Sequence, residues 1–265
     1  MEKEVYPKKE FYNISDLLAI VKILRGDNGC AWDKEQDHHS IRMDVLEEAY
    51  EVMEAIDSEN SDLLKEELGD LLLQVVFHAE LETENDSFDF DEVCDGICKK
   101  LIYRHPHVFG NIHVENSDEV LKNWDSLKSK SKGEETATHR LESVPKLLPS
   151  LMRGQKVCKR ASNAGLDIIN KADAIENIKV IVSQLETTVS SSNGDDAEKN
   201  LGNLLFACCN LASLLKKDGE KALTMAINQF IMQFRDMEDT AVSRGITIDQ
   251  MPQNELKALF RAGDN

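Results

Sequence analysis

Two neighbouring segments of the chain, LEEAYEVMEAI (46–56) and LKEELGDLLLQVVFHA (64–79), repeat their apolar residues at the three- and four-residue spacing of an amphipathic α-helix. The short polar stretch DSENS joins them, so we expect them to pack antiparallel as a helical hairpin. The same periodicity continues through most of the sequence, whereas proline and aromatic residues are few. The sequence therefore predicts an all-α fold.

The remaining helices follow from the same pattern. We expect helices over about 14–25, 40–56, 62–81, 90–103, 117–130, 146–163, 171–190, 195–217, 219–243 and 252–262. Short extended stretches are expected only near Val108 and Ile246. The charged segment KSKGEETATHR (130–140) has few apolar residues and indicates a linker or exposed loop. We place the boundary between two domains, 1–135 and 136–265, within it.

An internal repeat supports this division. EELGDLLLQVVFHA (66–79) aligns with KNLGNLLFACCNLA (199–212), so that the leucines and the glycine coincide. Asn200 and Asn203 then stand where the first copy has Glu67 and Asp70. The repeat indicates two related helical domains, of which only the first keeps the acidic residues. A chance match between two leucine-rich helices is the alternative.

Composition excludes several classes of protein. The net charge of −18 disfavours binding to nucleic acid, whose phosphates an acidic surface repels. No run of eighteen apolar residues predicts a transmembrane span, and the N-terminus lacks the apolar core of a secretory signal. The six cysteines form no CxxC pair, so we expect reduced thiols and a cytoplasmic protein.

The hairpin predicts a cluster of four carboxylates. A turn centred on residue 59 pairs Glu48 with Asp70 and Glu51 with Glu67, and each pair on one helix shares a face through its i, i+3 spacing. Carboxylates so close repel one another, and either protonation or a bound cation relieves the repulsion. Oxygen ligands select hard ions, which indicates Mg²⁺ or Mn²⁺.

A salt-bridged surface and a di-iron centre are both weaker interpretations of these acids. A solvated face with salt bridges does not suit Asp70, because no basic residue lies three or four positions from it. A di-iron carboxylate bundle needs Glu-x-x-His on two helices, and the one such spacing, Glu35 to His38, falls in a loop.

Further polar residues suggest contacts with a nucleotide. In CAWDKEQDHH (30–39), Trp32 could stack on a base while Asp33 or Gln36 reads its edge; alternatively Trp32 fills the core and Asp33 or Ser40 caps the next helix. A second group of candidates lies further along the chain: Lys100, Arg104, His105, His107, Lys122, Asn123, Trp124 and Lys128.

Lys100 and Arg104 are the main candidates of this group. Their i, i+4 spacing puts both on one helix face, where they could neutralise phosphate charge. The alternative is a cationic helix end that complements the helix dipole. The histidines that flank Pro106 could bind phosphate, or could cap backbone carbonyls at the end of the helix.

These motifs together resemble those of a known family. Glu47-Glu48-x-x-Glu51 followed by Glu67-x-x-Asp70 is similar to the EExxE…ExxD signature of the MazG nucleoside triphosphate pyrophosphohydrolases. CAWDKEQDHHS resembles the family's CPWDxxQTHxS, and RHPHVFG and NW recur in order. The resemblance covers nearly the whole chain, because longer members carry two tandem MazG domains.

The resemblance implies tandem helical bundles, with a four-helix-type core formed by dimerisation, in a homodimer that hydrolyses NTPs to NMP and pyrophosphate with Mg²⁺. Mn²⁺ is an expected substitute, and cleansing of the nucleotide pool is the expected purpose. Glu47 would be an extra ligand or the base that orients water, and Lys100 and Arg104 would neutralise the charge of the leaving pyrophosphate. The residues implied as metal ligands are Glu48, Glu51, Glu67 and Asp70.

The chain departs from the family's pattern at several positions. Ala31 replaces a proline, Asp37 a threonine and Tyr103 an arginine, and the family's KFxRRF appears as QFIMQF (229–234). Because acids and bases are lost together in the second domain, we expect it to be a dimerising or regulatory scaffold. The alternative for the whole chain is a nucleotide-sensing or dimerising module without hydrolysis, and a narrower dUTP or dCTP pyrophosphatase is the alternative within the enzymes.

Overall fold

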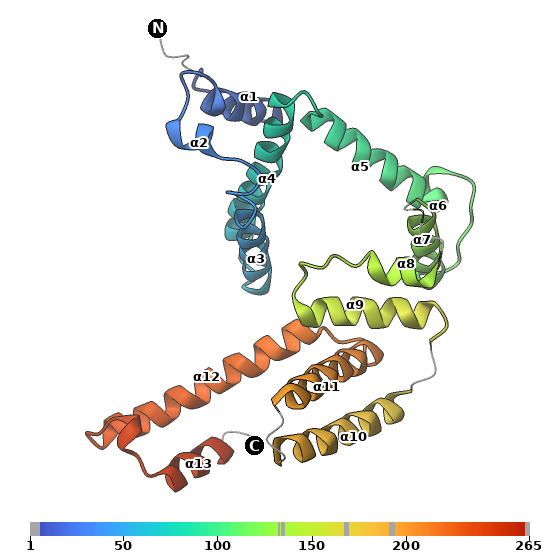
Figure 1. Cartoon of the computed structure of the whole chain (residues 1–265). Helices are drawn as coiled ribbons and strands as arrows, with labels where there is room; N and C mark the ends of the chain where they lie inside the picture. Colours follow the sequence, from blue (N-terminus) through green and yellow to red (C-terminus); the bar gives the residue numbers. More distant parts are fainter. Residues whose placement is uncertain (1–5, 132, 134–135, 167–169, 191–193, 263–265) are drawn as a thin grey trace. The chain divides into compact units, whose positions relative to one another are not determined.

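The computed structural model describes residues 6–131, 133, 136–166, 170–190 and 194–262. Within these ranges the chain forms thirteen α-helices and one 3₁₀ helix, with no strand, so the prediction of an all-α fold is confirmed (Figure 1). The elements are α1 Ile14–Arg25, α2 Ala31–Glu35, α3 Asp44–Asp57, α4 Ser61–Glu84, α5 Phe90–Arg104, α6 Pro106–Phe109, α7 Ser117–Ser131, α8 Ala137–Glu142, α9 Ser150–Asn163, α10 Lys171–Ser190, α11 Gly194–Leu214, α12 Gly219–Ser243, η1 Ile248–Gln250 and α13 Gln253–Ala262.

The differences from the predicted elements have local causes. α3 begins at Asp44 rather than near Ser40, because the Asp37 carboxylate accepts the backbone N–H groups of His39 and Ser40 at 2.9 and 2.8 Å and holds a turn there. Val108 lies in α6, which starts with Pro106 at its first position, so the extended stretch expected there is wrong. Ile246 lies in the turn after α12, and its N–H donates to the Ala241 carbonyl at 3.2 Å.

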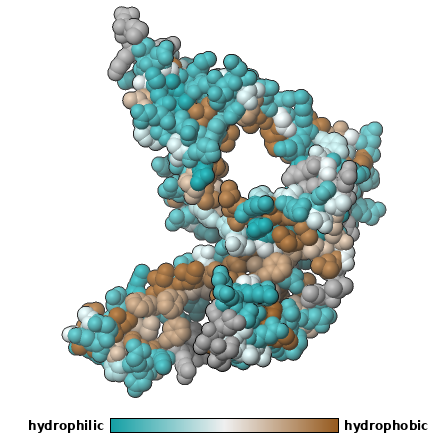
Figure 2. All heavy atoms as spheres, viewed as in Figure 1, coloured by the Kyte–Doolittle hydropathy of each residue, from teal (hydrophilic) through white to brown (hydrophobic). Residues whose placement is uncertain are grey.

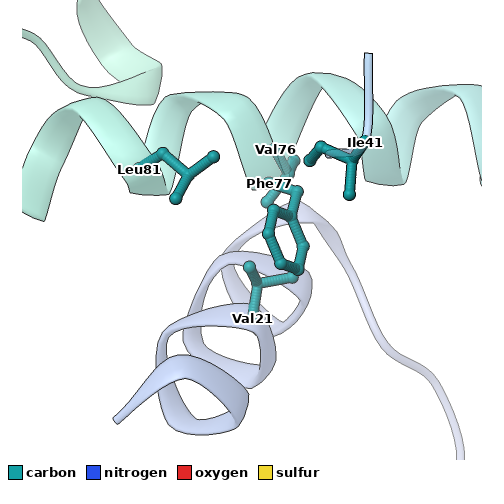
Figure 3. Close-up of a cluster of buried hydrophobic side chains, with 5 residues drawn as sticks. All are labelled: Val21, Ile41, Val76, Phe77 and Leu81. Atoms are coloured by element: carbon teal, nitrogen blue, oxygen red, sulfur yellow. The ribbon is translucent and has the colours of Figure 1, made fainter. Parts of the chain in front are cut away.

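Contacts between Cα atoms divide the chain into two units, Met1–Leu127 and Lys128–Asn265. In the first unit, α3 pairs with α4 and α1 packs across α4. Figure 3 shows Val21 of α1 and Ile41 meeting Val76 and Phe77 on α4, with Leu81 one turn further along; all five side chains are buried. This cluster fixes the C-terminal half of α4, whereas the N-terminal half carries the predicted metal ligands.

The ends of these helices are capped by side chains. The Asn60 side chain accepts the N–H groups of Asp62 and Leu63 at 3.1 and 3.2 Å and starts α4 directly after the turn. Asp89 forms a capping box with Glu92 at the start of α5. Phe90 packs against the buried cluster. The Asn60 cap fixes the start of α4 and therefore the positions of the polar residues in its first turns.

In the second unit the same order of contacts recurs. α10 pairs with α11, and α9 packs on α11, as α3 and α1 do with α4. The packing of α9 on α11 is close, since a Cβ atom added at Gly154 would lie 2.8 Å from the Cys209 sulfur. The α12 helix contacts α9 near one end and η1 and α13 near the other. In this unit the buried cysteines pack as small apolar side chains, and all six cysteines of the chain are free thiols.

None of the described helices is both long enough and apolar enough to cross a lipid bilayer.

Candidate metal and nucleotide site

The α3–α4 hairpin brings three carboxylates together. One oxygen from each of Glu48, Glu67 and Asp70 lies within 4.8 Å of the others. The turn between the helices makes this possible, because Glu59 adopts the left-handed region at φ +55° and reverses the chain at the residue on which the sequence centred the turn. Glu48 and Glu67 are half-buried, and Asp70 is exposed.

The fourth predicted carboxylate, Glu51, is not one of these three mutually close side chains. It is near enough for its charge to act on both Glu48 and Glu67. Burial raises the pKa of Glu48, and the neighbouring charges of Asp70, Glu51 and Glu67 raise it further. Burial also has the largest effect on the pKa of Glu67 and raises it. The negative charges of Glu51 and Asp70 raise it further. The hairpin therefore brings the predicted acids near one another and makes the negative charges of Glu48 and Glu67 less favourable.

The donor set fits a hard divalent cation. The four side chains offer only oxygen atoms, which Mg²⁺ and Mn²⁺ prefer. None of the ion pairs in the described part of the chain includes Glu48, Glu51, Glu67 or Asp70, so a salt-bridged acidic face does not explain the cluster. Glu47, the expected water-orienting residue, is exposed in the first turn of α3 and is not a member of the three-carboxylate group.

The Trp32 side chain is 59% exposed, which excludes the alternative that it fills the core. The amide of Gln36 donates to the Trp32 carbonyl at 2.9 Å and so closes the short helix α2. Neither Asp33 nor Ser40 caps α3, whose N-cap residue is Met43 without a side-chain hydrogen bond. Trp32 is therefore displayed on the surface of its loop.

Sequence reasoning missed the residues that hold this loop. Arg25 contacts the backbone carbonyls of Asp33 and Gln36, and His38 contacts His78 and Glu82. The arginine follows the pattern of an ordinary basic residue in the last turn of a helix, and the histidine falls in a polar loop. The only sequence feature that pointed to these residues was the pair of adjacent histidines, His38 and His39, in a mostly acidic stretch.

On α5, Lys100 is exposed and Arg104 is 8% exposed. The Arg104 guanidinium carbon lies 5.4 Å from the centre of the Trp124 ring, so the structure pairs two of the predicted substrate contacts with each other. Asn123 and Lys128 are half-buried on α7, and the side chain of Lys122 lies outside the described part of the chain. The ring Nδ1 of His105 lies 2.6 Å from the Leu101 carbonyl, as expected for a histidine that caps a helix end.

The second unit contains no equivalent of the carboxylate cluster among its described residues. Asn200 and Asn203 lie on α11, half-buried and exposed respectively. α12, η1 and α13 instead line a cavity of about 750 Å³ with Phe230, Phe234, Met237 and Phe260 among its walls. Figure 2 shows brown and tan apolar surface along these helices.

Comparison with known proteins places these features in a family. Residues 36–109 match the MazG nucleotide pyrophosphohydrolase domain, a span that contains the whole carboxylate cluster. The chain is 40% identical over 251 residues to the nucleoside triphosphate pyrophosphohydrolase of Escherichia coli K12, covering 94% of this chain and 95% of that protein.

Two further relatives extend the comparison. The nucleoside triphosphate pyrophosphohydrolase/pyrophosphatase MazG of Thermotoga maritima is 35% identical over 241 residues, which is 91% of each chain. The uncharacterized protein YabN of Bacillus subtilis is 36% identical over 251 residues, which is 94% of this chain and 51% of that protein.

Proposed function

The chain belongs to the MazG family of nucleotide pyrophosphohydrolases, and on that premise we propose that it hydrolyses nucleoside triphosphates to the monophosphate and pyrophosphate in a Mg²⁺-dependent reaction. The observation that carries the proposal is the convergence of Glu48, Glu67 and Asp70 within 4.8 Å, with Glu51 beside them. Cleansing of the cytoplasmic nucleotide pool is the purpose that we propose for this activity.

Each residue has a proposed role in the reaction. Glu48, Glu51, Glu67 and Asp70 hold the cation, with Mn²⁺ as a substitute for Mg²⁺. A bound divalent cation would polarise phosphoryl oxygens and lower the pKa of a coordinated water. Glu47 orients the attacking water and accepts its proton as the new bond to the α-phosphorus forms. The bond from the α-phosphorus to the bridging oxygen breaks, and the electron pair leaves with pyrophosphate.

We propose that the other candidates bind the substrate. Trp32, Asp33 and Gln36 contact the nucleoside. Lys100 and Arg104 neutralise charge on the leaving pyrophosphate, and Asn123, Trp124 and Lys128 are further candidates for contact with the substrate. The contact between Arg104 and the Trp124 ring supports a shared role, because it fixes the guanidinium in one place.

We propose two MazG-like domains, 1–135 and 136–265, the second of which no longer binds metal and nucleotide. The repeated helix order in the two units supports this division. Asn200 and Asn203 cannot supply the anionic ligands that Glu67 and Asp70 supply. The second domain then serves as a scaffold.

We propose a homodimer assembled on the α3–α4 hairpin. Apolar side chains recur along both helices at i, i+4, i+7 spacing and are between 39% and 52% exposed: Leu46, Tyr50, Met53, Leu68, Leu72 and Val75. Such a continuous stripe is typical of a helix face that packs against other helices, and two hairpins would form a four-helix core.

Pyrophosphate release measured with Mg²⁺ and with EDTA tests the function. We expect Asp70→Asn to lower kcat/KM by more than the roughly 10–100-fold that changes around a metal ligand cause, because it removes an anionic ligand. The far-UV circular dichroism should stay that of the parent. Asn203→Ala, the matched change in α11, should retain activity. Full turnover by Asp70→Asn would refute the assignment of the site.

The same assay on canonical, deoxy and damaged NTPs separates the alternatives. Release from dUTP or dCTP alone would identify a narrower pyrophosphatase. Mg²⁺–nucleotide binding without release from any substrate would favour the sensing module, for which the loss of acids at Asn200 and Asn203 and the Tyr103 departure are the supporting observations.

A further inference from the structure

The loop that presents Trp32, residues 30–41, is tied to α4 at two points. The first is Arg25, whose side chain is only 6% exposed although it is charged. Its Nε and Nη2 atoms donate to the two carboxylate oxygens of Glu84 at 2.6 and 2.7 Å, and its Nη1 atom donates to the carbonyls of Asp33 and Gln36. The guanidinium carbon also lies 5.1 Å from the centre of the Phe77 ring. One side chain therefore joins α1, the loop and α4.

The second point is a pair of histidines. His38 Nε2 lies 2.7 Å from a carboxylate oxygen of Glu82, and His38 Nδ1 lies 2.7 Å from His78 Nδ1. The two rings are nearly parallel, with centres 5.0 Å apart. A hydrogen bond between two Nδ1 atoms needs a proton on one of them and a lone pair on the other. Ile41 follows three residues later in the buried cluster and completes the attachment.

The attachments lie at a defined distance from the carboxylate cluster. Eight residues separate Asp70 from His78 in α4, which corresponds to about 12 Å along the helix axis. A triphosphate held by the carboxylates directs its nucleoside end away from the metal. The loop is attached to α4 at His78 and at Glu84, and Glu84 lies fourteen residues from Asp70, which corresponds to about 21 Å along the axis. The exposed Trp32 ring on this loop suits contact with the nucleoside.

We propose that Arg25 and His38 are positioning residues, which hold the Trp32 loop in register with α4 so that it binds the nucleoside end of the substrate. Neither residue touches the phosphates. Their contribution is to substrate affinity rather than to the chemical step. This inference rests on the proposed function of the same site.

The histidine pair makes the attachment sensitive to pH. Burial has the largest effect on the pKa of His78 and lowers it, and the neighbouring His38 lowers it further. The negative charge of Asp44, at the start of α3, acts in the opposite direction. The other charged groups around the pair are Glu82 on α4, Asp37 and His39 in the loop, and the Arg25–Glu84 pair. Above its lowered pKa, His78 is neutral and the bond can form. As the pH falls through the lowered pKa of His78, its Nδ1 atom becomes protonated and can no longer accept a hydrogen bond from His38.

The test is the steady-state release of pyrophosphate from Mg²⁺–NTP, using the nucleotide that the wild-type chain hydrolyses best. Arg25→Lys keeps the charge but loses the planar fork, and His38→Gln loses one of the two ring contacts. Each should raise KM about tenfold, as expected for the loss of a hydrogen bond to a charged group, and change kcat less than about twofold. The matched controls are Arg42→Lys and His39→Gln, at exposed neighbouring positions, and should change neither constant.

The pH profile gives a readout that a general loss of stability would not produce. The KM of the wild type should rise as the pH falls through the pKa of His78, which lies below the ordinary histidine value of about 6.5. His78→Phe keeps a ring in place but has no nitrogen, so its KM should be raised at all pH values and should lack that rise. A fall in kcat at unchanged KM, or equal KM in variants and wild type, would overturn the proposal.

A binding measurement separates this inference from the function. The intrinsic fluorescence of the wild-type chain reports titration with Mg²⁺–NTP, and comparison with Trp32→Phe gives the part of the signal that comes from Trp32, one of the two tryptophans. If the wild type releases no pyrophosphate but binds, the proposed function fails, and weaker binding by Arg25→Lys still supports the loop attachment. Release of pyrophosphate with no fluorescence change at Trp32 would overturn the loop proposal alone. The absence of both release and binding would overturn both.

Discussion

Asp16 shows how a single buried charge can be stabilised in this fold. The residue is 4% exposed and accepts hydrogen bonds from the Lys9 ammonium, the Tyr6 hydroxyl and the Asn13 backbone. These hydrogen bonds lower the pKa of Asp16 to about 2, and the bond from Lys9 has the largest effect. The carboxylate therefore ties the segment before α1 to the first turn of the helix.

The direction of the pKa shift predicts a pH dependence of stability. Because the folded pKa lies below the ordinary value of 3.8, Asp16 stabilises the fold fully above about pH 4, and the contribution is lost as the pH falls toward 2. We expect Asp16→Asn to lower the urea midpoint at pH 7 and to lie closer to the wild type at pH 3. A difference in midpoint that is constant between these pH values would contradict the role of the charge.

Residue spacing explains which parts of the candidate site were predictable. Glu48, Glu67 and Asp70 lie on two helices joined by a short turn, so their convergence followed from helix geometry alone. The contacts of His38 with His78 and of Arg25 with Glu84 join residues 40 and 59 positions apart. No local pattern encodes such pairs, because they depend on how α1 and the loop cross α4.

The length of each helix decided whether the sequence could predict it. The long helices were predicted because a periodic pattern of ten residues or more is distinctive. The short helices α2, α6 and α8, of five, four and six residues, were missed, since so few positions show no period. α8 also starts at Ala137, inside the stretch expected to be a linker.

The α4 helix carries one glycine whose role can be tested. Apart from the two neighbouring residues and the nearby backbone of α4 itself, no described atom lies within 4 Å of the position that a Cβ would occupy at Gly69, and the same holds for Gly202 in α11. Gly69→Ala should therefore stabilise the protein by about 1 kcal/mol, because alanine restricts the unfolded chain and favours helix. Urea unfolding measures this, with Gly202→Ala as the matched control. Destabilisation at Gly69 alone would mean that another molecule packs closely against that position.

At the scale of the whole molecule, the exposed apolar stripe on α3 and α4 predicts self-association. Leu72→Asp places a charge in the middle of the stripe and should convert a dimer into a species of the 29.9 kDa chain mass in sedimentation velocity. Val108→Asp, at an exposed apolar residue of α6, is the control and should leave the dimer intact. A wild type that sediments as a monomer would refute the homodimer.

The repeat predicted two helical units from fourteen aligned positions, and the order of helix contacts is the same in both. The boundary between the contact units, at Leu127 and Lys128, falls eight residues before the boundary drawn from the charged segment. Composition placed the sequence boundary in the polar stretch, whereas contacts divide the chain within α7, which is helical on both sides. A continuous helix has no compositional break, so the sequence could not locate this division.

The distribution of buried side chains along α4 has a consequence for motion. Val76, Phe77, Ala79 and Leu81 anchor its C-terminal half, while the tip of the hairpin near the turn buries only Ala55 of α3 among the described residues. Such a tip should open locally with less free energy than global unfolding, and its amides should exchange with deuterium sooner. A cation held by the carboxylates binds the closed hairpin only, so it would slow this exchange. Binding of the cation and amide protection at the tip of the hairpin then both report the equilibrium between the open and the closed hairpin.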